Sequence, residues 1–248
     1  MTNTHERCHL FESDWLGVST PPPRHRIEQS GWKVDQPQKT GSVFCNHCGR
    51  AVGDHLLPLS KNTCQACYNK RLPWLSVTRL GTYKDPLRRW IHDVKFRRDD
   101  AMGTTLGRML GQSVIDAGYG EEVDIVVPMP STFRRRLRRG IDHAAIITAA
   151  VASVLRRPMI RAIRKSARPP QRAVSGIQRP SNVAGSIHSA RLSSVSGSRI
   201  LLVDDIATTQ ASINEATKVL RKKCNTHSVR VAVLAVTDEQ HTNNLQHT

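Results

Sequence analysis

The sequence predicts an α/β fold, a parallel sheet flanked by helices, with a small cysteine-rich module on its N-terminal side. The first observation is the unbroken apolar run Ile200–Val203, which is typical of a strand buried on both faces of a parallel sheet. The second is a pair of mostly apolar runs, 123–127 and 229–236. The third is the three-and-four spacing of apolar residues over 213–220, which predicts an amphipathic helix after the central strand.

Each element of this sheet has its own signal. Pro128 and Pro130 end the first strand, because proline cannot donate a hydrogen bond to a central ladder. The last strand reads VRVAVLAV, which favours a core position. We therefore expect strands and crossover helices in the following order: strand Val123–Val127, helix Asp142–Leu155, strand Ser198–Asp204, helix Gln210–Lys222 and strand Val229–Val236.

The organisation of the whole chain follows from composition. The residues before the first cysteine pair contain three consecutive prolines, scattered charges and few apolar side chains, so no packed structure is expected there. Leu87, Ile91 and Val94 form a helical stripe within 83–100. The predicted organisation is a disordered segment 1–44, a cysteine module 45–75, a helical linker 76–112, a sheet domain 113–238 and a flexible tail 239–248.

Length and hydropathy limit the class of protein. A chain of 248 residues can bury a sizeable core and carry one small module beside it. Apolar stretches nowhere approach the roughly 20 residues that cross a bilayer, and the first residues do not resemble a signal peptide. A cytoplasmic location is the expectation that follows.

The net charge of +17 is concentrated in one part of the chain. Residues 131–180 contain 13 Lys and Arg against the single acid Asp142, which gives +12 of the +17. Polyanions are the expected partners of such a segment. Three interpretations stay open for its arginine run: a solvated helix face, contacts to a pyrophosphate group or a lid over it, and binding of nucleic acid.

Four of the six cysteines form two CxxC pairs separated by fifteen residues, which is the spacing of a zinc ribbon. Two thiolates of a tight knuckle can face one ion, and Gly49 lets the chain turn back after the first pair. Such a site has no open coordination position, so zinc would be structural. The alternative is two disulfides, which a reducing compartment disfavours. The predicted zinc ligands are Cys45, Cys48, Cys64 and Cys67.

The segment ILLVDDIATT, residues 200–209, joins the central strand to two carboxylates and a turn rich in hydroxyls. Carboxylates accept hydrogen bonds from the vicinal hydroxyls of a ribose, and the start of the next helix offers N–H groups to a phosphate. In open α/β sheets, ligands bind beyond the carboxyl ends of the strands. The segment therefore predicts a site for a phosphorylated ribose. The alternative is an ordinary turn that happens to be rich in Asp and Thr.

Taken in order, the motifs resemble the ComF family of competence-associated, type I phosphoribosyltransferase-like proteins, over about residues 45–237. The shared pattern is two CxxC pairs, Y-x-x-P-L-R…K-F, V-P-x-P, R-G-[FY]-[ND]-x-[AS], Q-R…R-x-x-N-V and V-D-D-x-x-T-T-G. This chain meets it at 45–67, 83–96, 127–130, 139–144, 171–183 and 203–209. Gln210 replaces the glycine of the phosphate loop, where glycine implies a positive φ or a close approach of the backbone.

The resemblance implies a site for phosphoribosyl diphosphate (PRPP) with Mg²⁺. Asp204 and Asp205 would contact the ribose hydroxyls and serve as the catalytic carboxylates. The 5-phosphate would lie in the loop Ala207, Thr208, Thr209, Gln210, Ala211 and Ser212. The resemblance also implies pyrophosphate contacts at Pro128 and Arg139, and a lid carrying Gln171, Arg172, Arg179 and Asn182.

Two functions follow from these observations. The first is Mg²⁺-dependent binding of PRPP, with transfer of its phosphoribosyl group to an acceptor that no segment of the sequence specifies, linked by the resemblance to natural competence and DNA uptake. The second is a non-catalytic competence factor that binds single-stranded DNA independently of sequence through its arginines. Aromatic platforms for bases are scarce, because the chain has only eleven Phe, Trp and Tyr (4 + 4 + 3).

Overall fold

A computed structural model of the chain describes residues 22–35, 44–51, 63–131, 142–166, 185–190, 193–208 and 210–237. The chain divides into two units, 1–33 and 34–248. The first unit contributes one described helix, α2 (Pro23–Gln29), which lies in the segment where no packed structure was expected. Proline at the first position of this helix has the φ value that a helix requires, and its missing N–H has no partner to lose there.

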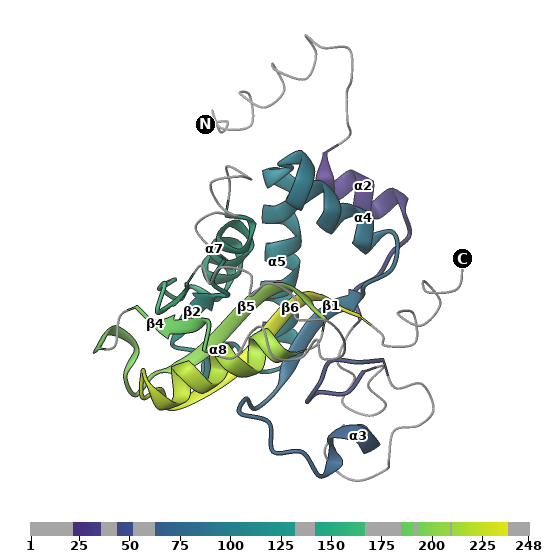
Figure 1. The fold of residues 1–248 in the computed structure, drawn as a ribbon. Coiled ribbons are helices and arrows are strands. Elements are labelled where there is room, and N and C mark those ends of the chain that lie inside the picture. The colour runs from purple at the N-terminus through teal and green to yellow at the C-terminus, as the bar shows by residue number, and fades with distance from the viewer. Residues whose placement is uncertain are drawn as a thin grey trace, which may run out of the picture. The chain divides into compact units, whose positions relative to one another are not determined.

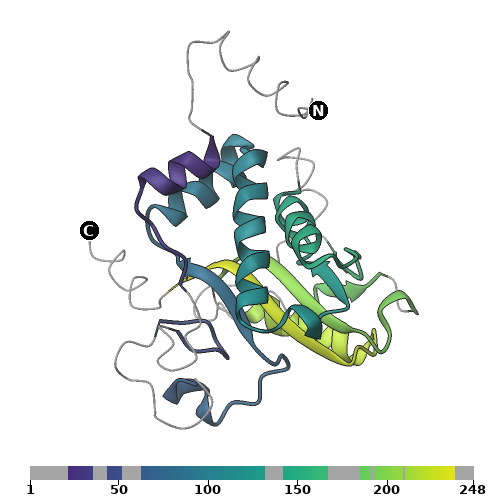
Figure 2. The ribbon, with the colours of Figure 1, turned by 180° about the vertical axis from the view of Figure 1, so that it is seen from behind.

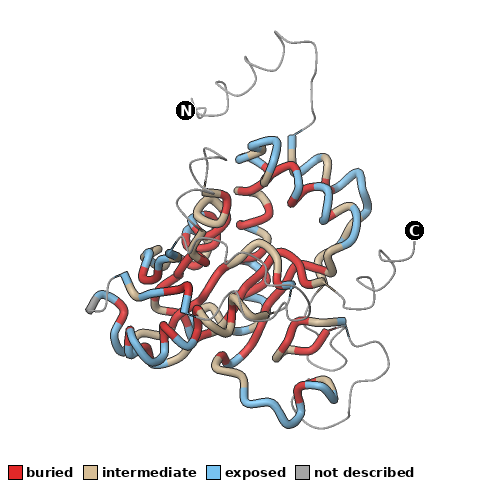
Figure 3. Tube along the Cα trace, in the orientation of Figure 1, coloured by how far each residue is buried: buried red, intermediate tan, exposed pale blue. Residues whose placement is uncertain are grey.

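The second unit is built on a four-stranded parallel sheet with the strand order β1-β6-β5-β2 (Figure 1). Three of its strands lie where the sequence predicts them: β2 (Ile125–Pro128), β5 (Arg199–Ala207) and β6 (Ser228–Val236). Their apolar residues are buried along almost their whole length, and the sheet is the most continuously buried part of the fold (Figure 3). The predicted α/β class with a parallel sheet is confirmed.

The fourth strand, β1 (Val77–Thr82), corrects the expectation that 76–112 is purely a helical linker. This strand pairs in parallel with β6 from Val77↔Val231 to Thr82↔Val236. Its sequence, VTRLGT, lacks a strand-like apolar pattern because Arg79 stands in the middle. Arg79 is nevertheless fully buried, since its guanidinium donates to Gly49 O at 2.7 Å and to Asp35 Oδ2 at 2.8 Å. These two hydrogen bonds compensate the cost of burying a charged side chain, which the sequence pattern alone would place on the surface.

Helices cover both faces of the sheet. On one face lie α5 (Asp100–Asp116) and α7 (His143–Leu155), which stand in front of the sheet in Figure 2. On the other face lies α8 (Ala211–Lys222), visible in front of the strands in Figure 1. The predicted helices near 142–155 and 210–222 therefore match α7 and α8.

Glycines allow α5 and α7 to approach closely. Gly103, Gly107 and Gly111 recur every four residues, so they lie on one face of α5. A Cβ atom at Gly107 would lie 2.6 Å from Ile147 O and 2.7 Å from Ala150 Cβ, which are contacts that no side chain tolerates. The stripe thus brings the backbones together and holds the first residues of α7 beside the sheet edge that carries the acidic pair.

Shorter elements complete the second unit. The stripe predicted within 83–100 forms α4 (Leu87–His92), which continues as the π-helix η2 (Asp93–Arg97). A small antiparallel pair, β3 and β4, packs beside α8. The bounds of the remaining short elements are β3 Ile163–Lys165, β4 Ile187–Ser189, α3 Gln65–Tyr68, and the 3₁₀ helices η3 Gly120–Glu122 and η4 Ser193–Val195. Among the described helices, none is long and apolar enough to cross a membrane.

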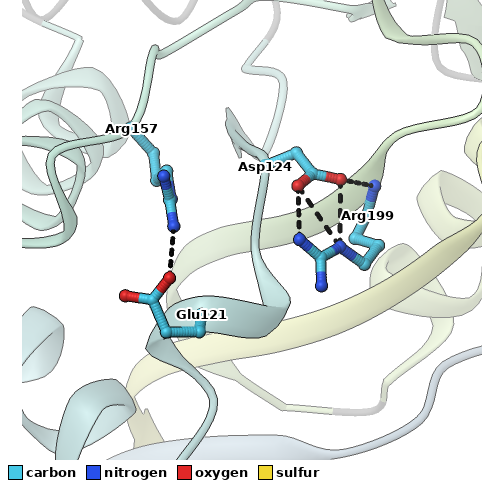
Figure 4. A network of polar contacts seen from close by, with 4 residues as sticks. All are labelled: Glu121, Asp124, Arg157 and Arg199. Carbon is cyan, nitrogen blue, oxygen red and sulfur yellow. Dashed lines mark hydrogen bonds and ion pairs between the residues drawn. The ribbon is translucent and has the colours of Figure 1, made fainter.

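An ion pair joins β2 and β5 at their N-terminal ends, the edge opposite the acidic pair (Figure 4). Asp124 Oδ1 accepts from the Arg199 guanidinium at 2.6 Å, and Oδ2 accepts from the Arg199 backbone N–H at 2.8 Å. The side-chain bonds from Arg199, followed by its backbone N–H, hold the pKa of Asp124 at about 2. Beside it, Arg157 contacts Glu121 at 3.0 Å. The first pair joins the two strand ends, and the second joins the chain after α7 to η3.

Candidate functional site

The acidic pair lies where β5 loses one of its two neighbours. Strand β2 ends at Pro128, which pairs with Val203, whereas β6 continues beside β5 as far as Ala207↔Val236. The sequence predicted that the strand ends at Asp204, but β5 runs three residues further because β6 keeps supplying a ladder partner. Asp204 and Asp205 therefore stand within the strand, on the side that the end of β2 leaves open.

A cavity of about 230 Å³ opens at this edge. Its wall includes both carboxylates, the turn after β2, the start of α7, one residue of α8 and two lysines from other elements. The residues that matter for its chemistry are Ser131, Asp142, His143, Asp204, Asp205 and Ser212, together with Lys95 and Lys165. A polar cavity at the carboxyl ends of parallel strands is where an α/β sheet binds its ligand.

The two carboxylates of the pair have different environments. Asp205 forms an ion pair with Lys95, with 3.0 Å between Oδ1 and Nζ, and both side chains are mostly buried. Asp204 Oδ1 accepts from the Asp205 backbone N–H at 2.9 Å. Burial and the neighbouring charge of Asp205 raise the pKa of Asp204 to about 8, although Lys95 and Lys165 act in the opposite direction. Burial therefore favours the protonated form of the Asp204 carboxyl in the free protein.

The predicted phosphate loop connects β5 to α8. Ala207 is buried at the end of the strand, Thr208 is exposed, and Thr209 lies outside the described residues. Gln210 is the N-cap of α8 and has φ of 58° and ψ of −6°, the left-handed conformation that glycine adopts without cost. Its carbonyl accepts the first helical hydrogen bond, from Asn214 N–H at 2.8 Å. Ala211 begins α8, and Ser212 in the same turn lines the cavity together with the carboxylates.

The other predicted contacts differ in how far the structure describes them. Pro128 is buried as the last residue of β2, and the cavity is lined by the three residues that follow it. Arg139 lies outside the described residues. The same holds for the four predicted lid residues, Gln171, Arg172, Arg179 and Asn182. The assignment of all these residues to PRPP stays a prediction.

Sequence reasoning assigned no role to four residues that line the cavity. Lys95 and Asp142 lie inside motifs that were identified, K-F and R-G-[FY]-[ND]-x-[AS], but the pattern alone shows no charge pairing. Lys165 is on β3 and His143 is the first residue of α7, and both are far from the acidic pair in sequence. Only the tertiary fold brings these two cations and two further titratable groups to the carboxylates.

The four predicted metal ligands come together in space. Their Sγ atoms all lie within 4.8 Å of one another, and Cys48 Sγ is 3.8 Å from Cys64 Sγ. Zinc–sulfur bonds of about 2.3 Å in a tetrahedron place sulfurs about 3.8 Å apart, whereas a disulfide requires about 2.05 Å. Among the described cysteines none is in a disulfide. The cluster could hold one metal ion, and the two-disulfide alternative does not fit.

Comparison with known proteins places the fold and the site in a class. The phosphoribosyl transferase domain family matches residues 102–246, and this span includes the acidic pair, the loop after it and the strands on either side. The chain therefore belongs to the phosphoribosyltransferase domain family.

Relatives that match along most of the chain narrow the class, and the resemblance to the ComF family is confirmed. Competence protein F of Haemophilus influenzae is 28% identical over 193 residues, covering 75% of this chain and 82% of the relative. DNA utilization protein YhgH of Salmonella typhi is 28% identical over 185 residues, covering 71% and 77%. A solved structure of the allosteric regulatory enzyme of purine biosynthesis is 22% identical, with a TM-score of 0.37 over 53% of this chain and 25% of that one.

The described part of the basic segment does not favour the DNA-binding alternative. Arg157 is paired with Glu121, and Arg161 is paired with Asp142 at 2.7 Å. Lys165 lines the cavity. Of the five Lys and Arg that the structure describes in 131–180, two are thus paired with acids and a third lines the cavity.

Proposed function

We propose that the chain binds PRPP together with Mg²⁺ in the cavity at the carboxyl edge of the sheet. The observation that carries the proposal is that Asp204 and Asp205 share one cavity with Ser212 in the first turn of α8 and with the two lysines Lys95 and Lys165. Carboxylates accept from ribose hydroxyls, and helix N–H groups bind a phosphate. A five-carbon sugar that carries phosphate at one end and pyrophosphate at the other matches this distribution of charge.

Each group of residues has a role in the proposal. Asp204 and Asp205 accept from the ribose 2- and 3-hydroxyls. The loop from Ala207 to Ser212 receives the 5-phosphate. Lys95 and Lys165 face the acidic pair with compensating charge, which suits a ligand more anionic than the pocket. Bound Mg²⁺ would neutralise part of the charge of the pyrophosphate. In proteins this ion is typically held by the phosphates of the substrate and by few carboxylates.

The reaction that this binding supports is displacement of pyrophosphate from the anomeric carbon by a nitrogen nucleophile. The bond from that carbon to the pyrophosphate oxygen breaks, a bond to nitrogen forms, and the nitrogen loses a proton. The carboxylates of Asp204 and Asp205 would offset the positive charge that develops on the ribose. By analogy with the relatives named Competence protein F and DNA utilization protein YhgH, we place this activity in the uptake and use of DNA.

We further propose that the four-cysteine cluster holds a structural zinc ion. The spacing of the sulfurs and their burial fit a closed tetrahedral site, in which the metal substitutes for a core that a short segment lacks. Zinc-binding thiols belong to a reducing compartment, which agrees with the cytoplasmic location expected from the sequence.

Thermal unfolding tests the proposal. We expect Mg²⁺ and PRPP at about 100 times the dissociation constant to stabilise the protein by about 2.7 kcal/mol, a rise in melting temperature of roughly 5–10 °C for a chain of this size. Asp204→Ala combined with Asp205→Ala should abolish the rise. Asp124→Asn, a carboxylate change at the opposite edge of the sheet, should keep it. The absence of any shift in the wild-type protein at millimolar PRPP would refute the proposal.

A further inference from the structure

The glutamine in the phosphate loop is hydrogen-bonded to the first knuckle of the cysteine module, residues 45–50. The side-chain amide of Gln210 donates from Nε2 to the backbone carbonyl of Cys48 at 2.9 Å, across 162 residues of sequence. A glycine at this position, as in the family pattern, has no side chain with which to make the contact. The one residue that departs from the phosphate-loop motif is therefore also the residue that joins this loop to the cysteine cluster.

The knuckle itself is held closely by the sheet domain. Each backbone carbonyl from Cys45 to Arg50 accepts a hydrogen bond, and four of the donors lie outside the knuckle. Asn46 O, His47 O, Cys48 O and Gly49 O accept respectively from Val77 N–H at 2.7 Å, Trp74 Nε1 at 2.8 Å, Gln210 Nε2 at 2.9 Å and the buried Arg79 guanidinium at 2.7 Å. Three of these donors belong to β1 and the segment before it, and only Gln210 belongs to the proposed ligand site.

The backbone of Gln210 makes this contact informative. Its φ of 58° is unfavourable for a residue with a side chain, so the conformation needs support from elsewhere. The hydrogen bond to Cys48 O supplies such support, because it fixes the side chain in the direction that the left-handed backbone gives it. The knuckle and the loop are thus linked by one hydrogen bond. Among the described residues, no second hydrogen bond joins them.

We propose that Gln210 is a positioning residue that couples the four-cysteine metal site to the phosphate loop, so that metal and phosphorylated ribose each favour binding of the other. The proposal rests on the proposed function for the identity of the sugar ligand. Coupling of two sites is reciprocal, so the factor by which PRPP tightens zinc binding equals the factor by which zinc tightens PRPP binding.

Competition with a chromophoric chelator measures the coupling in the full-length, zinc-loaded protein. We expect saturating Mg²⁺ and PRPP to raise the zinc affinity of the wild-type protein by about fivefold, which corresponds to one neutral hydrogen bond. In Gln210→Gly the factor should fall to one, because glycine keeps the left-handed backbone but has no amide. Gln112→Ala, a glutamine change on the exposed side of α5, should retain the wild-type factor. If Gln210 had only a structural role, Gln210→Gly would bind zinc and PRPP more weakly, but PRPP would still tighten the binding of zinc.

A second measurement does not need PRPP. Without any sugar ligand, Gln210→Gly should release zinc to excess chelator about fivefold faster than the wild-type protein, since the knuckle loses one of its four outside donors. The inference is overturned if the variant retains coupling, or if its zinc release matches that of the wild-type protein. If the wild-type protein binds PRPP but shows no coupling to zinc, the inference is also overturned, whereas the proposed function stays intact. Failure of PRPP to bind at all refutes the proposed function, and zinc release then decides the inference alone.

Discussion

The affinity for PRPP should depend on pH through Asp204. Its carboxyl has a pKa raised to about 8 by burial and by the charge of Asp205. The proposed complex needs this group as a carboxylate, so binding must expel a proton wherever the free protein holds one. Each pH unit below the pKa then costs a factor of about ten in affinity. We expect the affinity to rise about tenfold from pH 7 to pH 9 and to level off above the pKa.

Isothermal titration of the protein with PRPP and Mg²⁺ measures this directly. Titrations at several pH values between 7 and 9, in two buffers with different heats of ionisation, give both the affinity and the number of protons released. The phosphates of the ligand do not interfere, because their last ionisation lies near pH 6. We expect release of nearly one proton at pH 7 and of almost none at pH 9.

Two variants separate Asp204 from other titrating groups. Asp204→Asn should bind more weakly and lose the dependence on pH, because the amide has no proton to release. Lys95→Met should move the rise in affinity to higher pH, since Lys95 lowers the pKa of Asp204. Equal wild-type affinities at pH 7 and pH 9, with no proton release, would refute the role given to Asp204.

Two further predictions concern the frame that holds the site. Gly107→Ala should destabilise the protein by about 1–3 kcal/mol in urea unfolding, because the new methyl group meets the carbonyl of Ile147; helix propensity alone predicts a gain of about 1 kcal/mol, so a more stable variant would contradict the close packing of α5 on α7. Asp124→Asn should remove a stabilisation that is present above the unfolded pKa of about 4 and that the wild-type protein loses as pH falls towards about 2. The stability difference between wild type and variant should therefore be largest at neutral pH and vanish near pH 2, and a constant difference would show that the ion pair with Arg199 contributes nothing.

Local patterns were sufficient for those elements whose residues are uniform in character. Ile200–Val203 is apolar throughout and is buried throughout, and the four cysteines needed only their spacing to be recognised as one cluster. Strand β1 escaped prediction because Arg79 interrupts its apolar run. A buried arginine is compatible with a strand only when its partners are known, and both Gly49 and Asp35 are distant in sequence.

The boundaries of the site show the same division. The sequence predicted that the central strand ends at Asp204, because the apolar run Ile200–Val203 stops just before it. The neighbouring strand β6 overrules this prediction by continuing the ladder to Ala207. The family pattern has glycine at position 210, which indicated that this position requires either a positive φ or a close approach of the backbone. The structure shows the positive φ at Gln210, together with a hydrogen bond from its side chain to Cys48 O.

By itself, the sequence determined the α/β class, the metal-binding pattern and the acidic pair with its loop, because each depends on residues that are close together along the chain. The tertiary structure alone decided which cations face those acids, how far β5 extends, and that the cysteine module is joined to the phosphate loop. These features depend on contacts between distant segments, such as Lys95 with Asp205 and Gln210 with Cys48. Such contacts leave no periodic signal, since they form only after the sheet has brought the segments to one edge.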